Sequence, residues 1–520
     1  MLILLTVVIL MLTAVALLVL RLPRLNFRYF WLTAVGGTLA AWVTTWLWLP
    51  GLPFTLDLPA WQPSDIFSNA LSFLADGFSW PLAISLTTLA VAVLLTEVAR
   101  VDLTNPLPWA GTLALTGVGV AAVTANNPLT LVLVWAALDL GELVALLRAV
   151  RDPDATEGAI IGFSTRLFAI GLALWANIMS VAGGSRPEFG SLPPQAGIFL
   201  LVAAGLRLGV LPLHLPFSSE SALRRGVGTS MRLISAASSI VLLTRIPAAS
   251  LTLPVTPVLM VLAAIAAVYA GWTWLRAPDD LSGRPFWVIG LAALAVAAAL
   301  RGDPTGAAAW GCALVLCGGS LFLASAQHVW INRALLIAAF GVSALPFSLT
   351  GSGWQAAAPI FIGIWPFLLA AHALLLAGLV RHALRPGLRD NLASQPGWVR
   401  NVYPAGIGLL LLTILLLGIW GWDGAGRIGG WLPAAVSAIL ALALIWATPR
   451  VRLLNPIRAH WVRADRSLWL RGMYRLFSGL YRSLDALSES ISTALEGEGG
   501  IMWTLLFLAL FISFMIRGSQ

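Results

Sequence analysis

Apolar segments of bilayer-spanning length, separated by short polar loops, follow one another along almost the whole chain. A helix needs about 20 apolar residues to cross a bilayer, and among bilayer-spanning structures only helices and closed barrels satisfy their own backbone hydrogen bonds. The pattern predicts an all-α polytopic transmembrane protein of about 14–16 helices. The expected spans are residues 2–20, 30–50, 79–98, 107–124, 128–147, 159–183, 196–215, 228–247, 254–275, 286–300, 306–326, 333–350, 357–380, 402–421, 430–448 and 500–516.

The composition supports this class and argues against several others. Hydrophobic residues make up 59% of the chain and charged residues 10%, which is far from a soluble domain. The two cysteines, Cys312 and Cys317, form no disulfide framework, and the five histidines are scattered, so no metal site is expected. No phosphate-binding glycine loop, serine–histidine–aspartate arrangement or cofactor motif is present, so we expect no cofactor and no catalytic site in the chain itself.

The arginines predict the orientation of the chain. Arg21, Arg24 and Arg28 follow the first apolar segment, whereas loop 51–78 carries acidic residues and no basic ones. Positive residues favour cytoplasmic loops, so the N-terminus is expected outside, in a bacterial or archaeal plasma membrane or an equivalent energy-transducing membrane. Arg301 is an exception on the opposite side. The cytoplasmic loops would carry Arg148, Arg151, Arg224, Arg225, Arg276, Arg284, Arg381, Arg385, Arg389 and Arg400.

Arginine is the sole source of fixed positive side-chain charge, because the chain contains no lysine. A buried lysine can lose its proton, whereas arginine effectively cannot. Any proton relay in this protein must therefore use carboxylates, histidines and water. The net charge of +9 lies in loops between apolar segments, so it indicates membrane topology and not a nucleic-acid partner.

Residues 449–498 differ from the rest of the chain. Eight arginines lie between Arg450 and Arg482, and apolar residues recur in steps of three and four from Leu470 to Ile491. This pattern predicts an amphipathic helix on the cytoplasmic side, lying along the membrane or along neighbouring helices. The alternative is an ordinary interfacial helix that contacts only lipid. Residues 499–520 then form a C-terminal anchoring span.

Ionisable residues inside two expected spans are the first functional candidates, because such residues are costly at membrane depth. Asp139 and Glu142 are three residues apart and share a helix face. Two such carboxylates would have coupled, raised proton affinities, which suits proton binding and release. For Glu142 the alternative is an ion pair with Arg148 at the helix end.

Arg207 lies well inside the span 196–215 and needs a carboxylate partner. Asp139, Glu142 and Glu220 are the candidates. Arg207 could tune the proton affinity of its neighbour or hold an anion, but it cannot carry protons. For the similarly placed Arg166 and Arg232, a structural ion pair is the favoured interpretation.

Prolines indicate two broken helices in separate parts of the chain. Pro212 and Pro216 bracket His214, and Pro346 lies in the segment 344–353 with several glycines and serines. Broken helices in transporters built from repeats often mark an ion or substrate pathway. His372 stands alone in an apolar run. It could switch protonation near neutral pH, although a satisfied core histidine is the favoured interpretation.

These residues resemble the antiporter-like subunits shared by respiratory complex I, Mrp-type cation/proton antiporters and membrane-bound hydrogenases. The resemblance covers most of the chain and is closest to the distal complex I subunit, which has a lateral helix before its last span. The matching segments are Asp76-Gly77-Phe78-Ser79-Trp80-Pro81, Asn127 to Trp135, Arg207 to His214, Pro216 to Glu220, and Leu345-Pro346 with Gly351.

Four positions depart from the pattern of that family. Its acidic residue directly after the tryptophan is Ala136 here, and its central lysine falls on Arg207. Two further lysines fall on Ala237 and Gln355. The resemblance implies the fold, with inverted repeats of about five helices, and a place among other membrane subunits in a multisubunit complex.

The resemblance also implies the function that we expect. The chain would be a membrane subunit of a complex I-like oxidoreductase or related assembly, taking part in translocation of protons or monovalent cations. Asp139, Glu142 and Glu220 would be its carboxylates, Arg207 the charge modulator, and His214 a relay. The alternatives are a proton-silent structural subunit of such a complex, or a transporter of another ion that binds at Arg207.

The expected organisation divides the chain into five parts. Helices in 1–125 precede two antiporter-like repeats in 126–275 and 276–448, the second with its following helices. The lateral helix 449–498 and the anchoring span 499–520 complete the chain. Lipid is a further expected partner.

Overall fold

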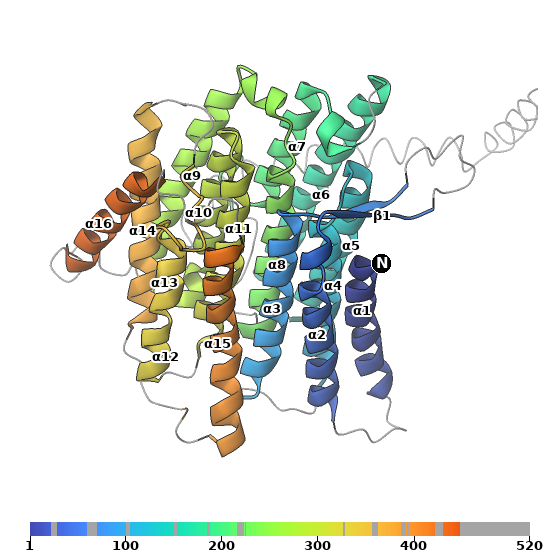
Figure 1. Ribbon diagram of the computed structural model, residues 1–520, viewed down its shortest axis with the longest axis vertical. Coiled ribbons are helices and arrows are strands. Elements are labelled where there is room, and N and C mark those ends of the chain that lie inside the picture. Colours follow the sequence, from blue (N-terminus) through green and yellow to red (C-terminus); the bar gives the residue numbers. More distant parts are fainter. Residues whose placement is uncertain are drawn as a thin grey trace, which may run out of the picture. The chain divides into compact units, whose positions relative to one another are not determined.

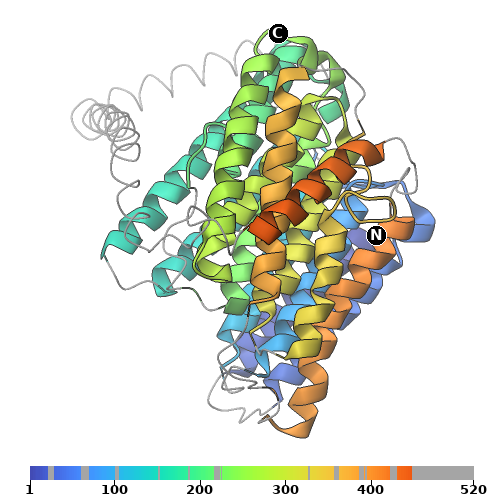
Figure 2. The same ribbon diagram turned by 90° about the vertical axis from the view of Figure 1, so that its left-hand side faces the viewer.

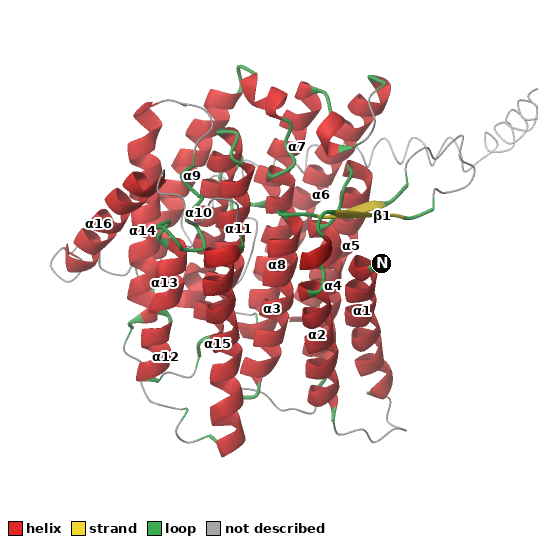
Figure 3. Cartoon of the chain, in the orientation of Figure 1, coloured by secondary structure: helices red, strands yellow, loops and turns green. Residues whose placement is uncertain are grey.

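The computed structural model is a bundle of helices with one short pair of strands (Figures 1 and 3). It describes residues 1–21, 29–59, 70–99, 105–149, 153–184, 188–215, 223, 225–325, 328–355, 362–385, 392, 395–421 and 430–447. The predicted lateral helix and the final span lie outside these residues.

The helices of the described residues agree closely with the predicted spans. Their bounds are α1 Leu2–Leu20, α2 Phe30–Trp46, α3 Ser79–Glu97, α4 Leu107–Val123, α5 Pro128–Ala149, α6 Pro153–Ala182, α7 Pro194–Arg207, α8 Arg225–Leu243, α9 Thr256–Arg276, α10 Asp280–Leu300, α11 Pro304–Leu323, α12 Val329–Ala334, α13 Leu336–Val342, α14 Trp365–Ala383, α15 Gly397–Trp420 and α16 Trp431–Ala447.

The length and composition of these helices identify an integral membrane protein. Within the described residues, 11 helices are long and apolar enough to cross a membrane. Shorter apolar helices occur at Leu107–Val123, Pro194–Arg207, Val329–Val342 and Trp431–Ala447. The prediction of an all-α polytopic fold is confirmed.

The centre of the bundle is built from helices that are buried on almost every side. The most apolar windows of α10 and α11 are 100% buried and those of α3 and α8 are 94% buried, against 28% for α1 and α2. Alanine and glycine dominate α10 and α11, and such small side chains let helix backbones approach closely. The outer helices instead leave large apolar side chains exposed, as expected beside lipid. In Figure 2, α16 crosses α14 obliquely.

A short hairpin leads into α3, which the sequence did not predict. Strand β1 (Phe54–Asp57) pairs antiparallel with β2 (Ser72–Ala75). Asp76 follows β2 and accepts hydrogen bonds from the backbone N–H groups of Phe78 and Ser79. Its second carboxylate oxygen pairs with Arg245, 2.5 Å away, beyond the end of α8. The Asp-Gly-Phe-Ser motif is thus a helix start anchored by an ion pair.

Two helices are interrupted, each the fourth in a run of five. The first run is α4–α8, and its α7 ends at Arg207 before the non-helical segment 208–215. The second run is α9–α14, and its α12–α13 pair ends at Val342 before the segment 343–355. Because successive spans alternate in direction, corresponding helices of the two runs point oppositely, which is the relation expected of inverted repeats.

The two breaks differ in their backbone geometry. The first contains Gly209 with a φ of +74°, a conformation that glycine adopts without strain. The second places Ala344 and Phe347 at φ values of 58° and 64°, where side chains are disfavoured. Both predicted breaks are present at Pro212 and Pro346, while Pro216 lies outside the described residues.

Candidate functional site

A buried ion pair between α5 and α7 forms the centre of the site. Arg207 Nη1 and Nη2 donate to the two carboxylate oxygens of Asp139 at 2.5 and 2.8 Å. Each residue is only 2% exposed. A two-point contact between a guanidinium and a carboxylate is among the strongest charge-assisted hydrogen bonds. Of the three partners that the sequence offered Arg207, the structure identifies Asp139.

The neighbouring helix α8 orients Arg207. Its Nε donates to Ser239 Oγ at 3.2 Å, and its guanidinium lies 4.3 Å from the centre of the Trp135 ring. Trp135 is one turn before Asp139 on α5, and its indole N–H donates to Ser238 O. Trp135, the last residue of the Asn127–Trp135 segment, therefore lies one turn from the acid and stacks on its basic partner.

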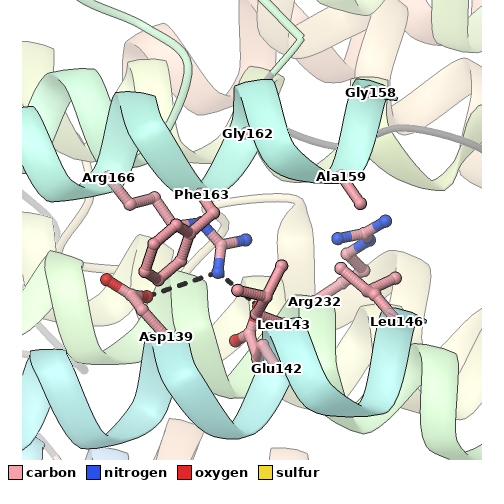
Figure 4. Close-up of a pocket in the computed structure, with 10 residues that line it drawn as sticks. All are labelled: Asp139, Glu142, Leu143, Leu146, Gly158, Ala159, Gly162, Phe163, Arg166 and Arg232. Atoms are coloured by element: carbon pink, nitrogen blue, oxygen red, sulfur yellow. Dashed lines mark hydrogen bonds and ion pairs between the residues drawn. The ribbon is translucent and has the colours of Figure 1, made fainter. Parts of the chain in front are cut away.

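A second arginine, from α6, completes the cluster (Figure 4). Arg166 Nη1 contacts Asp139 Oδ1 at 3.4 Å and pairs closely with Glu142 Oε2. The alternative pairing of Glu142 with Arg148 is therefore not the one that the structure shows. We call Asp139, Glu142, Arg166 and Arg207 the four-residue cluster. Its two acids and two guanidinium groups balance in charge, which offsets much of the cost of burying them.

A small cavity adjoins Glu142 between α5 and α6. Its volume is about 10 Å³, enough for roughly one water molecule. Glu142 Oε1 has no hydrogen-bond partner among the described residues and is available to this space. Arg232 of α8 also contributes to the wall (Figure 4). The lining residues are Asp139, Glu142, Leu143, Leu146, Gly158, Ala159, Gly162, Phe163, Arg166 and Arg232.

The remaining predicted site residues fall in three places. His214 lies in the first helix break, where its Nδ1 is 2.8 Å from Pro212 O. Glu220 lies outside the described residues. His372 is on α14, part of the second run, and its hydrogen-bond partners Val342 and Ser437 lie outside the four-residue cluster.

His372 instead secures the second helix break. Its Nε2 is 2.7 Å from Val342 O, the last residue of α13, and its Nδ1 is 2.8 Å from Ser437 Oγ. Since a carbonyl oxygen accepts only, Nε2 must carry a proton. Both nitrogens are bonded, which agrees with the interpretation as a satisfied core histidine.

The positions that differ from the family pattern are mostly apolar. Ala237 is fully buried on α8, and Ala136 is half-buried on α5. Ser239 Oγ, which Arg207 contacts, donates to Ser235 O within α8, so this branch of polar contacts returns to the α8 backbone. The next residue of α8, Ile240, packs closely over Gly311 of α11. Gln355 lies at the end of the second break.

Sequence reasoning missed two polar groups on other parts of the bundle. One is the Asp76–Arg245 pair. The other comprises Arg301 and Asp303, buried at the turn between α10 and α11. Arg301 had broken the distribution of arginines among the loops, and its burial explains why. That exception was the signal that could have found this group.

Comparison with known proteins gives matches of structure but not of sequence. No family model matches the chain, and no curated protein matches it. A structure of the Mrp complex from Dietzia sp. DQ12-45-1b matches with a TM-score of 0.70 at 14% identity. That match covers 100% of this chain and 63% of the other. The chain has the antiporter-like fold.

A second structure supports the same assignment of fold. It is the membrane-bound sulfane sulfur reductase, described as an archaeal respiratory membrane complex, with a TM-score of 0.64 at 13% identity. The match covers 98% of this chain and 99% of that one. This chain therefore matches nearly the whole length of the chain from the sulfane sulfur reductase, and 63% of the longer chain from the Mrp complex.

Proposed function

We propose that this chain is a membrane subunit of a multisubunit ion-translocating complex, in which Asp139 and Glu142 bind and release protons. The observation that carries the proposal is the four-residue cluster between α5, α6 and α7. It occupies the region where the resemblance places a family acid and a family lysine. Other membrane subunits and lipid would be its partners, and protons or monovalent cations the transported species.

The acid–base pairing of this region is kept, with the acid moved by one turn. Asp139 stands three residues after Ala136, so it lies on the same face of α5. It bonds directly to Arg207, at the position of the family lysine. Because arginine keeps its proton, protons can enter or leave this cluster only through its two carboxylates.

Glu142 is the better placed of the two acids to receive a proton. Asp139 accepts from Arg207 with both oxygens, whereas Glu142 has one oxygen on Arg166 and one available to the cavity. Protonation of Glu142 would weaken its bond to Arg166, because a guanidinium interacts most strongly with an ionised carboxylate. Arg166 could then move fully onto Asp139, which it already contacts.

The two structural neighbours support the setting in a complex. Each belongs to a membrane assembly, one named as an Mrp complex and the other as a respiratory membrane complex. A guanidinium holds each acid of the four-residue cluster, so proton uptake would need the cluster to open. Movement of the broken helix α7, which carries Arg207 at its end, is a suitable means of opening it.

A proton-silent structural subunit is the second candidate function. It is favoured by the apolar residues at Ala136 and Ala237 and by the Ser239 hydroxyl, which returns to its own helix. In that case the four-residue cluster would hold α5, α6 and α7 together and carry no protons. The two candidates differ in a single measurable quantity, which is proton flux.

The deciding experiment uses the native complex reconstituted in vesicles. Glu142→Gln and Asp139→Asn each remove a titratable group while keeping its size, and Glu188→Gln, an exposed position, serves as the matched control. We expect proton flux to fall to the level of empty vesicles in the first two variants and to stay unchanged in the control. Full flux in both cluster variants, with assembly intact, would establish the proton-silent role.

A further inference from the structure

The second run contains a buried arginine and a buried aspartate that form no ion pair within the part of the chain that the structure describes. Arg301 and Asp303 lie at the turn between α10 and α11 and are only 2% and 7% exposed. Arg301 donates from Nε to Ala297 O and from Nη2 to Gly353 O, both at 3.1 Å. Its Nη1 has no hydrogen-bond partner among the described residues.

Tryptophan rings hold the Arg301 guanidinium in place. Its Cζ lies 5.4 Å from the centre of the Trp354 ring and 5.1 Å from that of Trp365. A cation over aromatic faces is stabilised without being neutralised. The charge of Arg301 therefore stays available to a group that approaches Nη1.

Asp303 presents one free oxygen to the same region. Its Oδ1 accepts from Gly306 N at 2.8 Å, capping α11, while Oδ2 is without a partner among the described residues. A Cβ on Gly306 would lie 2.3 Å from Oδ2 and 3.2 Å from Ser352 O. The absence of a side chain at Gly306 thus allows the Asp303 carboxylate to lie close to Ser352, within the second helix break (segment 343–355).

Further polar atoms on that segment are also buried without partners in the described part of the chain. Ser352 Oγ and Trp354 Nε1 belong to this set, in residues 0% and 3% exposed. Together with Arg301 Nη1 and Asp303 Oδ2 they provide donors and an acceptor on the same turn and segment. Buried polar groups of this kind are costly unless something satisfies them.

We propose that Asp303 is a second proton-binding site of this protein, reached through water that bridges its Oδ2 to Arg301 Nη1. Water fits the mixed set because it both donates and accepts. A metal cation would be opposed by Arg301, and an anion by ionised Asp303. A proton from bulk solvent reaches Oδ2 through the bridging water, which takes up one proton as it passes another to the carboxylate, and the proton leaves by the reverse of these steps.

The electrostatic surroundings make Asp303 responsive near neutral pH. Burial raises the pKa of the Asp303 carboxyl to about 6, against the opposing influence of the Gly306 N–H and of Arg301. Arg301 is the charged group beside Asp303, and His372 of α14 packs against Trp310 and Trp354. Asp76 and Arg245, beyond the end of α8 on the same side of the bundle, are paired with each other. The segment 343–355 contains no charged or titratable residue.

This site rests on the proposed function only in that the chain handles protons. It belongs to other helices than the four-residue cluster and provides a carboxylate in the second run, where one family lysine falls on Gln355. An acid that exchanges protons through water is a chemical replacement for a lysine that does the same. It also gives a function to Arg301, an exception to the expected distribution of arginines among the loops.

Infrared difference spectroscopy of the purified complex between pH 4 and pH 8 tests the assignment. A protonated buried carboxyl gives its own C=O band, and we expect one that titrates with a midpoint of about 6. Asp303→Asn should abolish this band, and Asp57→Asn, at an exposed position in β1, should leave it. Trp354→Phe removes the indole N–H and should shift the midpoint upward, because the ionised carboxylate loses a donor of its water network.

The outcomes separate this proposal from the proposed function. The same band in Asp303→Asn, or a midpoint near the ordinary aspartate value of about 4, would overturn the assignment. Loss of the band in Asp303→Asn but not in Asp139→Asn supports it whatever the vesicle flux shows, since the measurement is made at equilibrium. Should Asp303→Asn fail to assemble, Gly306→Ala, which pushes Oδ2 aside, must move the midpoint; no shift would count against the site.

Discussion

The two five-helix runs hold buried arginine and aspartate in opposite ways. In the first run, Arg207 and Asp139 are in direct two-point contact, and Arg166 and Glu142 add a second pair. In the second run, Arg301 and Asp303 are two residues apart in sequence, yet Arg301 Nη1 and Asp303 Oδ2 are not bonded to each other. Both arrangements are electrically neutral when every group is charged.

The difference shows how geometry, not composition, sets the response to protons. A guanidinium in direct contact favours the ionised carboxylate, whereas burial without contact favours the protonated one. The same two residue types therefore give direct ion pairs in the first run and, in the second, a carboxyl whose pKa is raised to about 6.

Removing the basic partner in the first run should cost the most. Arg207→Gln leaves the Asp139 carboxylate buried without its main partner, and such a change costs on the order of 3–5 kcal/mol. Denaturation of the purified protein in detergent measures it, with the exposed Arg333→Gln as control. Adding Asp139→Asn should restore much of the lost stability. A double variant as unstable as Arg207→Gln alone would contradict the pairing of Arg207 with Asp139.

Asp303 of the second run should make the free energy of unfolding decrease as pH rises, whereas an aspartate in an ordinary ion pair makes it increase. The pKa of Asp303 is raised from 3.8 to about 6, so its folded state binds the proton more tightly than the unfolded state. Its contribution to the free energy of unfolding is fully present below about pH 4 and is lost as pH rises through about 6. A pKa shift of about two units corresponds to a contribution on the order of 3 kcal/mol. Unfolding measured across this range should lose this slope in Asp303→Asn.

The Asp76–Arg245 pair provides a reference with the reverse sign. Burial opposes ionisation of Asp76, but Arg245 and Ser79 outweigh it and hold its pKa below the usual value. Its contribution is present above about pH 4 and is lost as pH falls through the lowered pKa. Asp76→Ala should cost about 1–2 kcal/mol at pH 7 and progressively less in acid. An equal cost from Asp57→Ala would show that the pair has no special role.

The smallest effects concern the backbone of the two breaks. Gly209→Ala places a side chain at a φ of +74° and should destabilise by about 1 kcal/mol. Ala344→Gly relieves a φ of 58° and should stabilise by up to about 1 kcal/mol. Thermal unfolding of the two variants measures whether each change in stability has the expected sign. Changes of the same sign in both variants would contradict the difference in backbone geometry.

Much of the fold could be predicted from the sequence because each span is an apolar segment long enough to cross a bilayer. Alternation of apolar segments and arginine loops predicted the helices of the described residues, with ends that differ by up to eight residues, and the two breaks followed from Pro212 and Pro346. The hairpin before α3 was not predicted, because strands of four residues leave almost no periodic signal. The five-part division of the chain and the lateral helix stay predictions.

The site was predictable in its residues but not in its pairings. Asp139, Glu142 and Arg207 were candidates because charge at membrane depth is rare. Their partners depend on which helices face one another, and that information is spread over the whole bundle. Arg166 was therefore expected to pair, with no partner named. Asp303 was missed because one acid in a loop is unremarkable until its burial is known.

The shared carboxylate of Asp139 has a mechanical consequence. Guanidinium groups from α6 and α7 contact the same acid on α5, so one side chain joins three helices at a single point. Neither α6 nor α7 can slide along α5 without straining a bond that also restrains the other. Displacement of one helix, by a neighbouring subunit or by its own broken end, is thus transmitted to the next through a junction only a few atoms wide.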